Sequence, residues 1–337
     1  MDKDTRDTGG GAPASATVRL DDAAARPDRA AASPHGGGAE RPATRRPPWW
    51  RSRTALGYLF VLAPMLFLFV VLIVPIGYNL WVSLHSWRLT SVTGPEFVGL
   101  ANYIEVLQTP RWRDTIVRTA IFVVLTVVLQ VIVGFGTALF LHRHFPKARA
   151  LRVALLLPMM VSEVAVGNVW RLLYNYDGGL LNWALGLIGV DRVFWLGPDM
   201  AFFSIVLTDV WQNAPFVTLV IFAALQTMPK DILEAADLDG ATGWARIRQI
   251  IVPVVQPAVL LVLIFQTMFA IRSFGTIWIL TEGGPGTATT LLSIDIFRVA
   301  LQSYDVGLAS TLSWFLVLIN LVVAIIYMRW LKRDSLS

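Results

Sequence analysis

The chain has 337 residues, of which 55% are hydrophobic and only 15% are charged, and its mean hydropathy is positive. A soluble domain of this length could not bury so much apolar surface in one core, so the composition excludes an ordinary globular protein and predicts a membrane protein. The chain contains no cysteine, which excludes disulfides, thiolate metal sites and thiol nucleophiles, and its net charge of +5 comes from basic residues at the ends of apolar segments rather than from a nucleic-acid-binding patch.

The first 48 residues differ in composition from the rest of the chain. They are rich in Ala, Gly, Pro, Arg and Asp and show no apolar periodicity, which predicts a disordered cytoplasmic tail over residues 1–48. The first apolar run begins near Leu56 and is far longer than the apolar region of a cleavable signal peptide. Residues 49–337 are therefore predicted to form one transmembrane domain.

Six apolar segments are long enough to cross a bilayer, which takes about 20 helical residues each. Unpaired backbone groups have no water to bind in lipid, so every span must be a helix. The predicted fold class is therefore all-α, a polytopic membrane protein with six transmembrane helices. The spans run roughly over Leu56–Leu84, Thr119–Leu141, Leu151–Leu173, Phe202–Leu225, Val254–Leu280 and Val306–Leu331.

Basic residues are unevenly distributed between the two sides of this topology. The flank before the first span, the second and fourth loops and the C-terminal end carry fifteen Lys and Arg, whereas the opposite side carries six. Loops rich in Lys and Arg stay in the cytoplasm. Both termini, and the loop between the fourth and fifth spans, are therefore predicted to be cytoplasmic.

The fourth loop, about residues 230–253, is a polar insert between two spans. Glu234, Ala235 and Ala236 are predicted to begin a short helix with a small-residue face, and Gly240 supplies the positive φ that ends it. An amphipathic segment then runs to Pro253, which marks the entry to the next span. Such a projection fits the groove of a partner protein.

The sequence contains no motif for an ATP site, a metal site or a catalytic site. The chain has no Gly-x-x-x-x-Gly-Lys-Ser/Thr phosphate loop, so any ATP chemistry must come from a partner. His142 and His144 could suggest a metal pair, but no third ligand lies nearby, and a solvated loop end is the preferred interpretation. No catalytic residue and no metal site is therefore predicted.

Polar residues inside the predicted spans indicate a solute site, because ionisable groups at membrane depth are costly and usually pair or line a cavity. Counting helical rise places four of them in one layer just outward of the midplane, with aromatic side chains close by. Aromatic faces beside amide, carboxylate and guanidinium groups suit a sugar, which offers C–H faces and hydroxyls. An alternative is that Glu163 and Arg272 form a structural ion pair between helices. The layer contains Glu163, Asp209, Asn213 and Arg272, with Trp170, Tyr174, Trp211, Phe274 and Trp278.

The fourth loop carries the clearest resemblance to a known family. Its Glu-Ala-Ala at 234–236, Asp239-Gly240-Ala241 and Pro253 resemble the signature loop of the permease subunits of bacterial ABC importers. Further motifs at 97–103, 209–216 and 280–285 are similar to those of sugar importers of the maltose, glycerol-phosphate and trehalose type. The resemblance covers about residues 56–333. One departure is Gly275, which stands where an Asp often follows the preceding Phe.

The resemblance implies a type I ABC importer permease fold and ATP-driven import of an oligosaccharide or related polyol by alternating access. The implied location is the bacterial cytoplasmic (inner) membrane, surrounded by lipid. Implied partners are a second, homologous permease, two ATP-binding subunits that carry ATP and Mg²⁺, and an extracytoplasmic solute-binding protein. The implied ATPase-coupling residues are Glu234, Ala235, Ala236, Asp239, Gly240 and Ala241.

Two other classes remain as alternatives. An ion-coupled secondary transporter or channel would use Glu163, Asp209 and Arg272 to relay protons or ions, but it leaves the signature loop without a role. A membrane-embedded hydrolase is less favoured, since no Ser/His or metal constellation occurs within the spans.

Overall fold

The computed structural model of the protein describes residues 53–145, 149–229 and 243–334. The chain divides into two units, residues 1–61 and 62–337, and the described part of the first is the beginning of the first helix. The coupling residues predicted between 234 and 241, and the predicted tail, lie outside the described residues.

The described part of the chain is mostly helical, as the predicted spans require, and it has one small antiparallel strand pair, β1 (His85–Ser86) with β2 (Glu96–Phe97), in which His85 lies opposite Phe97. The first span is continuous from α1 through a π-helical segment, η2, to α2. The helical segments are α1 (Arg53–Leu68), η2 (Phe69–Ile73), α2 (Val74–Ser83), α3 (Ala101–Gln108), α4 (Pro110–His144), α5 (Arg149–Met160), α6 (Glu163–Leu173), α7 (Leu180–Leu187), α8 (Ala201–Gln226), α10 (Gly243–Arg246), η3 (Ile247–Ile251), α11 (Val252–Ile271), α12 (Gly275–Thr281), α13 (Leu292–Phe297), η4 (Arg298–Gln302) and α14 (Val306–Asp334).

Within the described residues, five helices are long and apolar enough to cross a membrane, or six if one bent pair is counted as a single span. The second, fourth and sixth predicted spans each lie inside one long helix, α4, α8 and α14 respectively. Helix α4 begins before its predicted span because Pro110 occupies the first turn, where its missing N–H is not needed.

The third predicted span is not one straight helix. Its two halves, Val153–Met160 and Glu163–Leu173, meet at an angle of 99°. Pro158 lies inside the last turn of α5, and the extended backbone of Ser162 (φ −62°, ψ 145°) stops the helix. The Ser162 hydroxyl then caps α6 by accepting the N–H of Ala165 at 3.3 Å. The hydropathy pattern of the sequence predicts the length of this span but not its bend.

The fifth predicted span also differs from the structure, because its helix ends at Ile271 instead of Leu280. Phe274 has a non-helical backbone (φ −140°, ψ −60°), and α12 begins at Gly275 as a separate helix. At the other end, helical structure reaches back through η3 to Gly243, into the segment predicted as part of the fourth loop.

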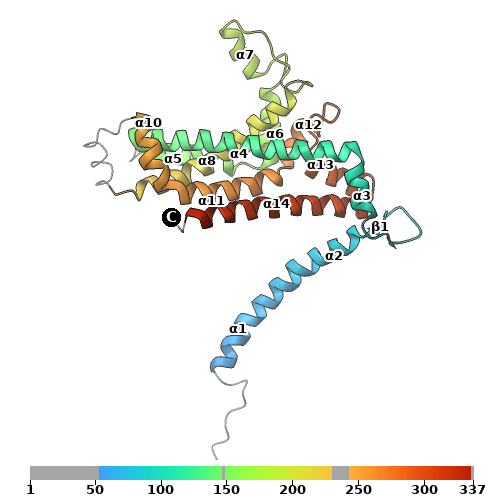
Figure 1. The fold of residues 1–337 in the computed structure, drawn as a ribbon. Helices are drawn as coiled ribbons and strands as arrows, with labels where there is room; N and C mark the ends of the chain where they lie inside the picture. Colours follow the sequence, from blue (N-terminus) through green and yellow to red (C-terminus); the bar gives the residue numbers. More distant parts are fainter. Residues whose placement is uncertain (1–52, 146–148, 230–242, 335–337) are drawn as a thin grey trace, which may run out of the picture. The chain divides into compact units, whose positions relative to one another are not determined.

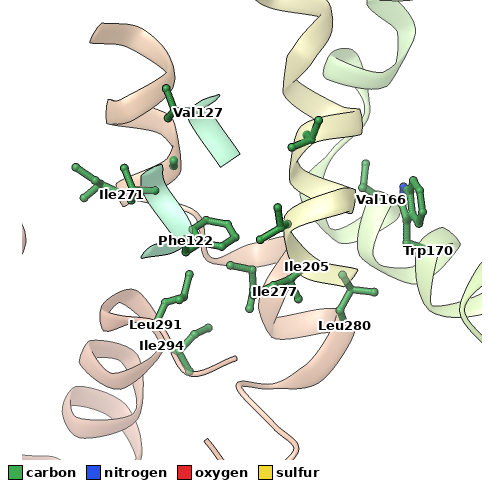
Figure 2. Packing of buried hydrophobic residues seen from close by; sticks show 14 of the residues in the cluster. Phe122, Val127, Val166, Trp170, Ile205, Ile271, Ile277, Leu280, Leu291 and Ile294 are labelled. Atoms are coloured by element: carbon green, nitrogen blue, oxygen red, sulfur yellow. The ribbon is translucent and has the colours of Figure 1, made fainter. Parts of the chain in front are cut away.

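The long helices α4, α8 and α11 pack side by side, and α11 also contacts α14 (Figure 1). The most extensive contact joins α4 to α8, with α6 packed against α12 nearby. Figure 2 shows apolar side chains from α4, α6, α8, α11 and α12, and from the start of α13, packed together in one cluster. The labelled members are Phe122, Val127, Val166, Trp170, Ile205, Ile271, Ile277, Leu280, Leu291 and Ile294.

Candidate functional site

The candidate site is built around the two helix breaks, at 161–162 between α5 and α6 and at 272–274 between α11 and α12. A broken helix frees backbone N–H and C=O groups that lipid cannot satisfy, so side chains or neighbouring helices must take them up. In membrane transporters such broken helices commonly surround the solute. Several of the polar residues predicted from the sequence lie at these breaks or next to them.

Glu163 links the two breaks directly. Its Oε2 accepts the backbone N–H of Gly275 at 2.8 Å, and its backbone carbonyl accepts the hydroxyl of Thr276 at 3.3 Å. A Cβ added at Gly275 would lie 2.5 Å from Oε2 of Glu163, so the glycine permits this close approach. The departure noted at Gly275 therefore has a structural reason in this chain.

Arg272 contacts Met268 and Phe269 rather than the carboxylate of Glu163. Its Nε donates to the carbonyl of Met268 at 3.3 Å, and its guanidinium lies 6.0 Å from the centroid of the Phe269 ring. Within the described ranges, no ion pair joins Arg272 to Glu163. The alternative of a structural ion pair is therefore not seen, because Glu163 instead binds the first N–H of α12.

Asp209 is a buried carboxylate that ties α8 to two other elements. Its Oδ1 accepts Nε2 of Gln130 from α4 at 2.7 Å, and its Oδ2 accepts the hydroxyl of Ser273, in the second break, at 3.2 Å. Its backbone carbonyl accepts Nδ2 of Asn213 at 3.1 Å. No cation pairs with Asp209 in the described part of the chain, so neutral donors alone compensate its burial.

The five predicted aromatic residues divide into two groups. Trp170 and Tyr174 face the interior, and the Tyr174 hydroxyl donates to the carbonyl of Ser204 at 2.9 Å. Trp211 is 42% exposed, and its ring lies edge-on to that of Trp170 at 5.5 Å. Phe274 and Trp278 are partly buried and stack on each other with centroids 5.9 Å apart. The first group supports the packing of α6 on α8, and the more accessible rings are those of Trp211, Phe274 and Trp278.

Three glutamines in the same helices were missed by the sequence reasoning. Gln130, Gln212 and Gln266 are all buried, on α4, α8 and α11 respectively. Gln130 holds Asp209, and Gln266 donates through Nε2 to the carbonyl of Asn213 at 2.9 Å. Polar groups at membrane depth are costly unless they are paired or line a cavity. This rule singled out the charged residues, and it applies to these amides too.

The histidines near the end of α4 do not gather a metal site. The described residues contain no group of three His, Cys, Asp or Glu side chains placed to hold a metal ion. Nδ1 of His144 lies 3.1 Å from the backbone carbonyl of Phe140, one turn earlier in the same helix.

Comparison with known proteins places the chain in a family. Residues 98–333 match the family described as "Binding-protein-dependent transport system inner membrane component". The chain is 38% identical to the trehalose/maltose transport system permease protein MalF of Thermococcus litoralis, over 83% of this chain and 95% of the relative. It is 31% identical to the sulfoquinovosyl glycerol transport system permease protein SmoG of Agrobacterium fabrum, over 82% of this chain and 91% of the relative.

A solved structure agrees at the level of the fold. A chain in the crystal structure of a bacterial alginate ABC transporter, in complex with an alginate pentasaccharide-bound periplasmic protein, superposes with a TM-score of 0.73 at 22% identity. The superposition covers 85% of this chain and 98% of the other. Together with the family match, this confirms the predicted ABC importer permease fold, and the chain belongs to the family of inner-membrane permease components of binding-protein-dependent ABC transport systems.

Proposed function

We propose that this chain is the membrane-spanning permease subunit of an ATP-driven importer of an oligosaccharide or a related sugar-containing solute. Relatives that match most of the chain are named as permeases for trehalose, maltose or sulfoquinovosyl glycerol. The observation in the structure that carries the proposal is the pair of helix breaks joined by Glu163, with polar and aromatic side chains around them. Broken helices at a solute site are typical of transport proteins.

The solute contacts are proposed for the partly accessible side chains near the breaks. Trp211, Phe274 and Trp278 would stack on the apolar face of a sugar ring, and Asn213 and Arg272 would hydrogen-bond its hydroxyls. Glu163 and Asp209 have their carboxylates engaged by the protein, so they would shape the site by holding the breaks in place. Trp170 and Tyr174 would support the site from the packed face of α6.

The proposed partners are a second homologous permease, two ATP-binding subunits and an extracytoplasmic solute-binding protein. ATP and Mg²⁺ would bind to the ATP-binding subunits, and the fourth loop of this chain, with Glu234, Ala235, Ala236, Asp239, Gly240 and Ala241, would dock on them. Closure of those subunits would switch the spans between inward-facing and outward-facing states. Solute released by the binding protein would then reach the layer around the breaks.

The test is solute uptake by the purified complex in proteoliposomes. We expect uptake to require ATP and the solute-binding protein, and to persist when an ionophore collapses the membrane potential. Uptake that runs on an ion gradient without ATP would instead support the ion-coupled transporter, in which Glu163, Asp209 and Arg272 relay ions.

The orientation of the chain is a second prediction. Since the basic residues favour cytoplasmic termini, Gly36→Cys and Leu336→Cys in this cysteine-free chain should react with a membrane-impermeant maleimide only from the cytoplasmic side. Thr287→Cys, at an exposed position after α12, should react only from outside. Labelling of Thr287→Cys only in inside-out vesicles would reverse the orientation and place the fourth loop on the wrong side for ATP-binding subunits.

A further inference from the structure

We propose that the end of the bundle opposite the second helix break carries a binding site for an anionic phospholipid, where α4, α8 and the segment from α10 to η3 meet. The proposal goes beyond the proposed transport function and takes from it only the orientation, which puts these helix ends at the cytoplasmic leaflet. Helix α11 separates this end from the break at 272–274 by 20 residues, or about 30 Å of helical rise.

The site is a cavity of about 610 Å³. Its described lining comes from three places in the sequence, the last turns of α4, the end of α8 with Met228 just beyond it, and the segment from Gly243 to Ile251. A volume of this size is in the range of sites that enclose small ligands. The chemistry of the lining therefore decides what the cavity can hold.

One part of the lining is basic. His142, Arg143 and His144 come from the last turn of α4, and Arg246 comes from the end of α10. No Asp or Glu is among the described residues that line the cavity. The lining therefore favours an anion, and basic pockets between transmembrane helices on the cytoplasmic side are typical sites for phospholipid headgroups.

His142 adds a buried polar atom that needs a partner. Its Nδ1 is inaccessible to solvent, and none of the residues that the structure describes forms a hydrogen bond with it. Leaving a buried polar atom unpaired costs free energy, so such atoms usually have a partner. A phosphate oxygen would accept a hydrogen bond from Nδ1 in the tautomer that carries the proton there.

The other part of the lining is apolar, and it distinguishes a lipid from a free anion. A phosphate ion alone would leave this surface in contact with water, whereas a phospholipid brings a phosphate and an acyl chain in one molecule. Helices α4 and α8 are both long and apolar enough to span a membrane, so lipid is at hand where they end. The apolar residues are Leu139, Phe140, Leu225, Met228, Ile247 and Ile251.

Photolabelling of the complete complex, with its ATP-binding subunits, tests the proposal. The complex is reconstituted in phosphatidylcholine nanodiscs with a subsaturating fraction of phosphatidylglycerol that carries a diazirine on its acyl chain, and labelled peptides are identified by mass spectrometry. We expect labelling within residues 139–144 and 243–251. Phosphatidylcholine with the same diazirine chain should label these segments at least about fivefold less, because its headgroup has no net charge.

Two arginine variants test the headgroup contact. Arg143→Gln and Arg246→Gln should each lower the phosphatidylglycerol labelling about fivefold, the effect expected of one basic residue beside an anionic lipid. Arg143 is exposed, so Arg143→Gln still tests the site if Arg246→Gln impairs assembly. The matched control is Arg248→Gln, the same change at an exposed arginine of η3 that is not among the described lining residues, and it should leave the labelling unchanged.

Three results would overturn the site. Equal labelling by the two lipids would remove the headgroup preference, and displacement of the lipid by inorganic phosphate in large excess would assign the cavity to a free anion. No labelling of these segments in the complete complex would show that the ATP-binding subunits cover the cavity instead. A complex that labels as expected but shows no ATP-dependent uptake would contradict the proposed transport function and leave the lipid site in place.

Discussion

Gly134→Val is expected to prevent α4 and α8 from packing. A Cβ at position 134 would lie 2.5 Å from Cβ of Val217, 2.6 Å from its Cγ1 and 3.0 Å from the carbonyl of Ala214. These atoms belong to a β-branched side chain and to backbone, so the helices themselves would have to separate. Overpacking of this kind costs about 2–3 kcal/mol, and here it acts on the most extensive helix contact in the described part of the chain.

The measurement is thermal unfolding of the purified permease, together with its monodisperse yield. Gly136→Val is the matched control, because it lies in the same helix, has the same change of residue and meets nothing within 4 Å. A valine in a helix is close to neutral relative to glycine, so the control should unfold near the wild-type temperature. Equal unfolding temperatures for the two variants would contradict the close approach of α4 and α8.

Glu234→Lys and Gly240→Val are expected to abolish ATP-driven uptake. The proposed docking needs a small-residue helix that begins at Glu234 and a turn that Gly240 makes without steric cost. A reversed charge would oppose docking, and a β-branched residue would oppose the turn. Both variants should still insert, since no span is altered, but solute should no longer stimulate ATP turnover by the complex.

Asp231→Lys provides the control for this second prediction. It makes the same charge reversal in the same loop, three residues before the Glu-Ala-Ala pattern begins. We expect it to keep most of the uptake. Normal solute-stimulated ATP turnover in both Glu234→Lys and Gly240→Val would exclude a coupling role for this loop.

The sequence singled out Glu163 and Asp209 as residues that need partners, because an unpaired charge in lipid is costly wherever it occurs. In the structure both carboxylates accept hydrogen bonds from neighbouring elements. The sequence left open, as an alternative to a solute site, a structural ion pair between Glu163 and Arg272. The structure instead gives Glu163 the N–H of Gly275, since the break in the fifth span exposes that group at 2.8 Å.

The accessible face of each helix was likewise not readable from the sequence. Trp170 and Tyr174 were grouped with Trp211 because all three are aromatic residues in one layer. In the structure the first two are buried against α8 and only Trp211 is substantially exposed, because α6 turns by 99° and packs on both α8 and α12. Residue type and depth do not define which side of a bent helix faces the rest of the chain.

The sequence by itself determined the existence, the approximate limits and the helical nature of the spans, and it identified the family. It could do so because lipid accepts only segments that are long, apolar and internally hydrogen-bonded, a requirement that each segment meets alone. Only the tertiary structure decided where the third and fifth spans break, and that Gln212, Glu163 and Asp209 take up the groups around those breaks. A helix break is stable only when side chains from other helices hydrogen-bond the backbone groups that it frees. Its position therefore depends on residues 50 or more positions away in the chain, as when Gln212 donates to the carbonyl of Val161.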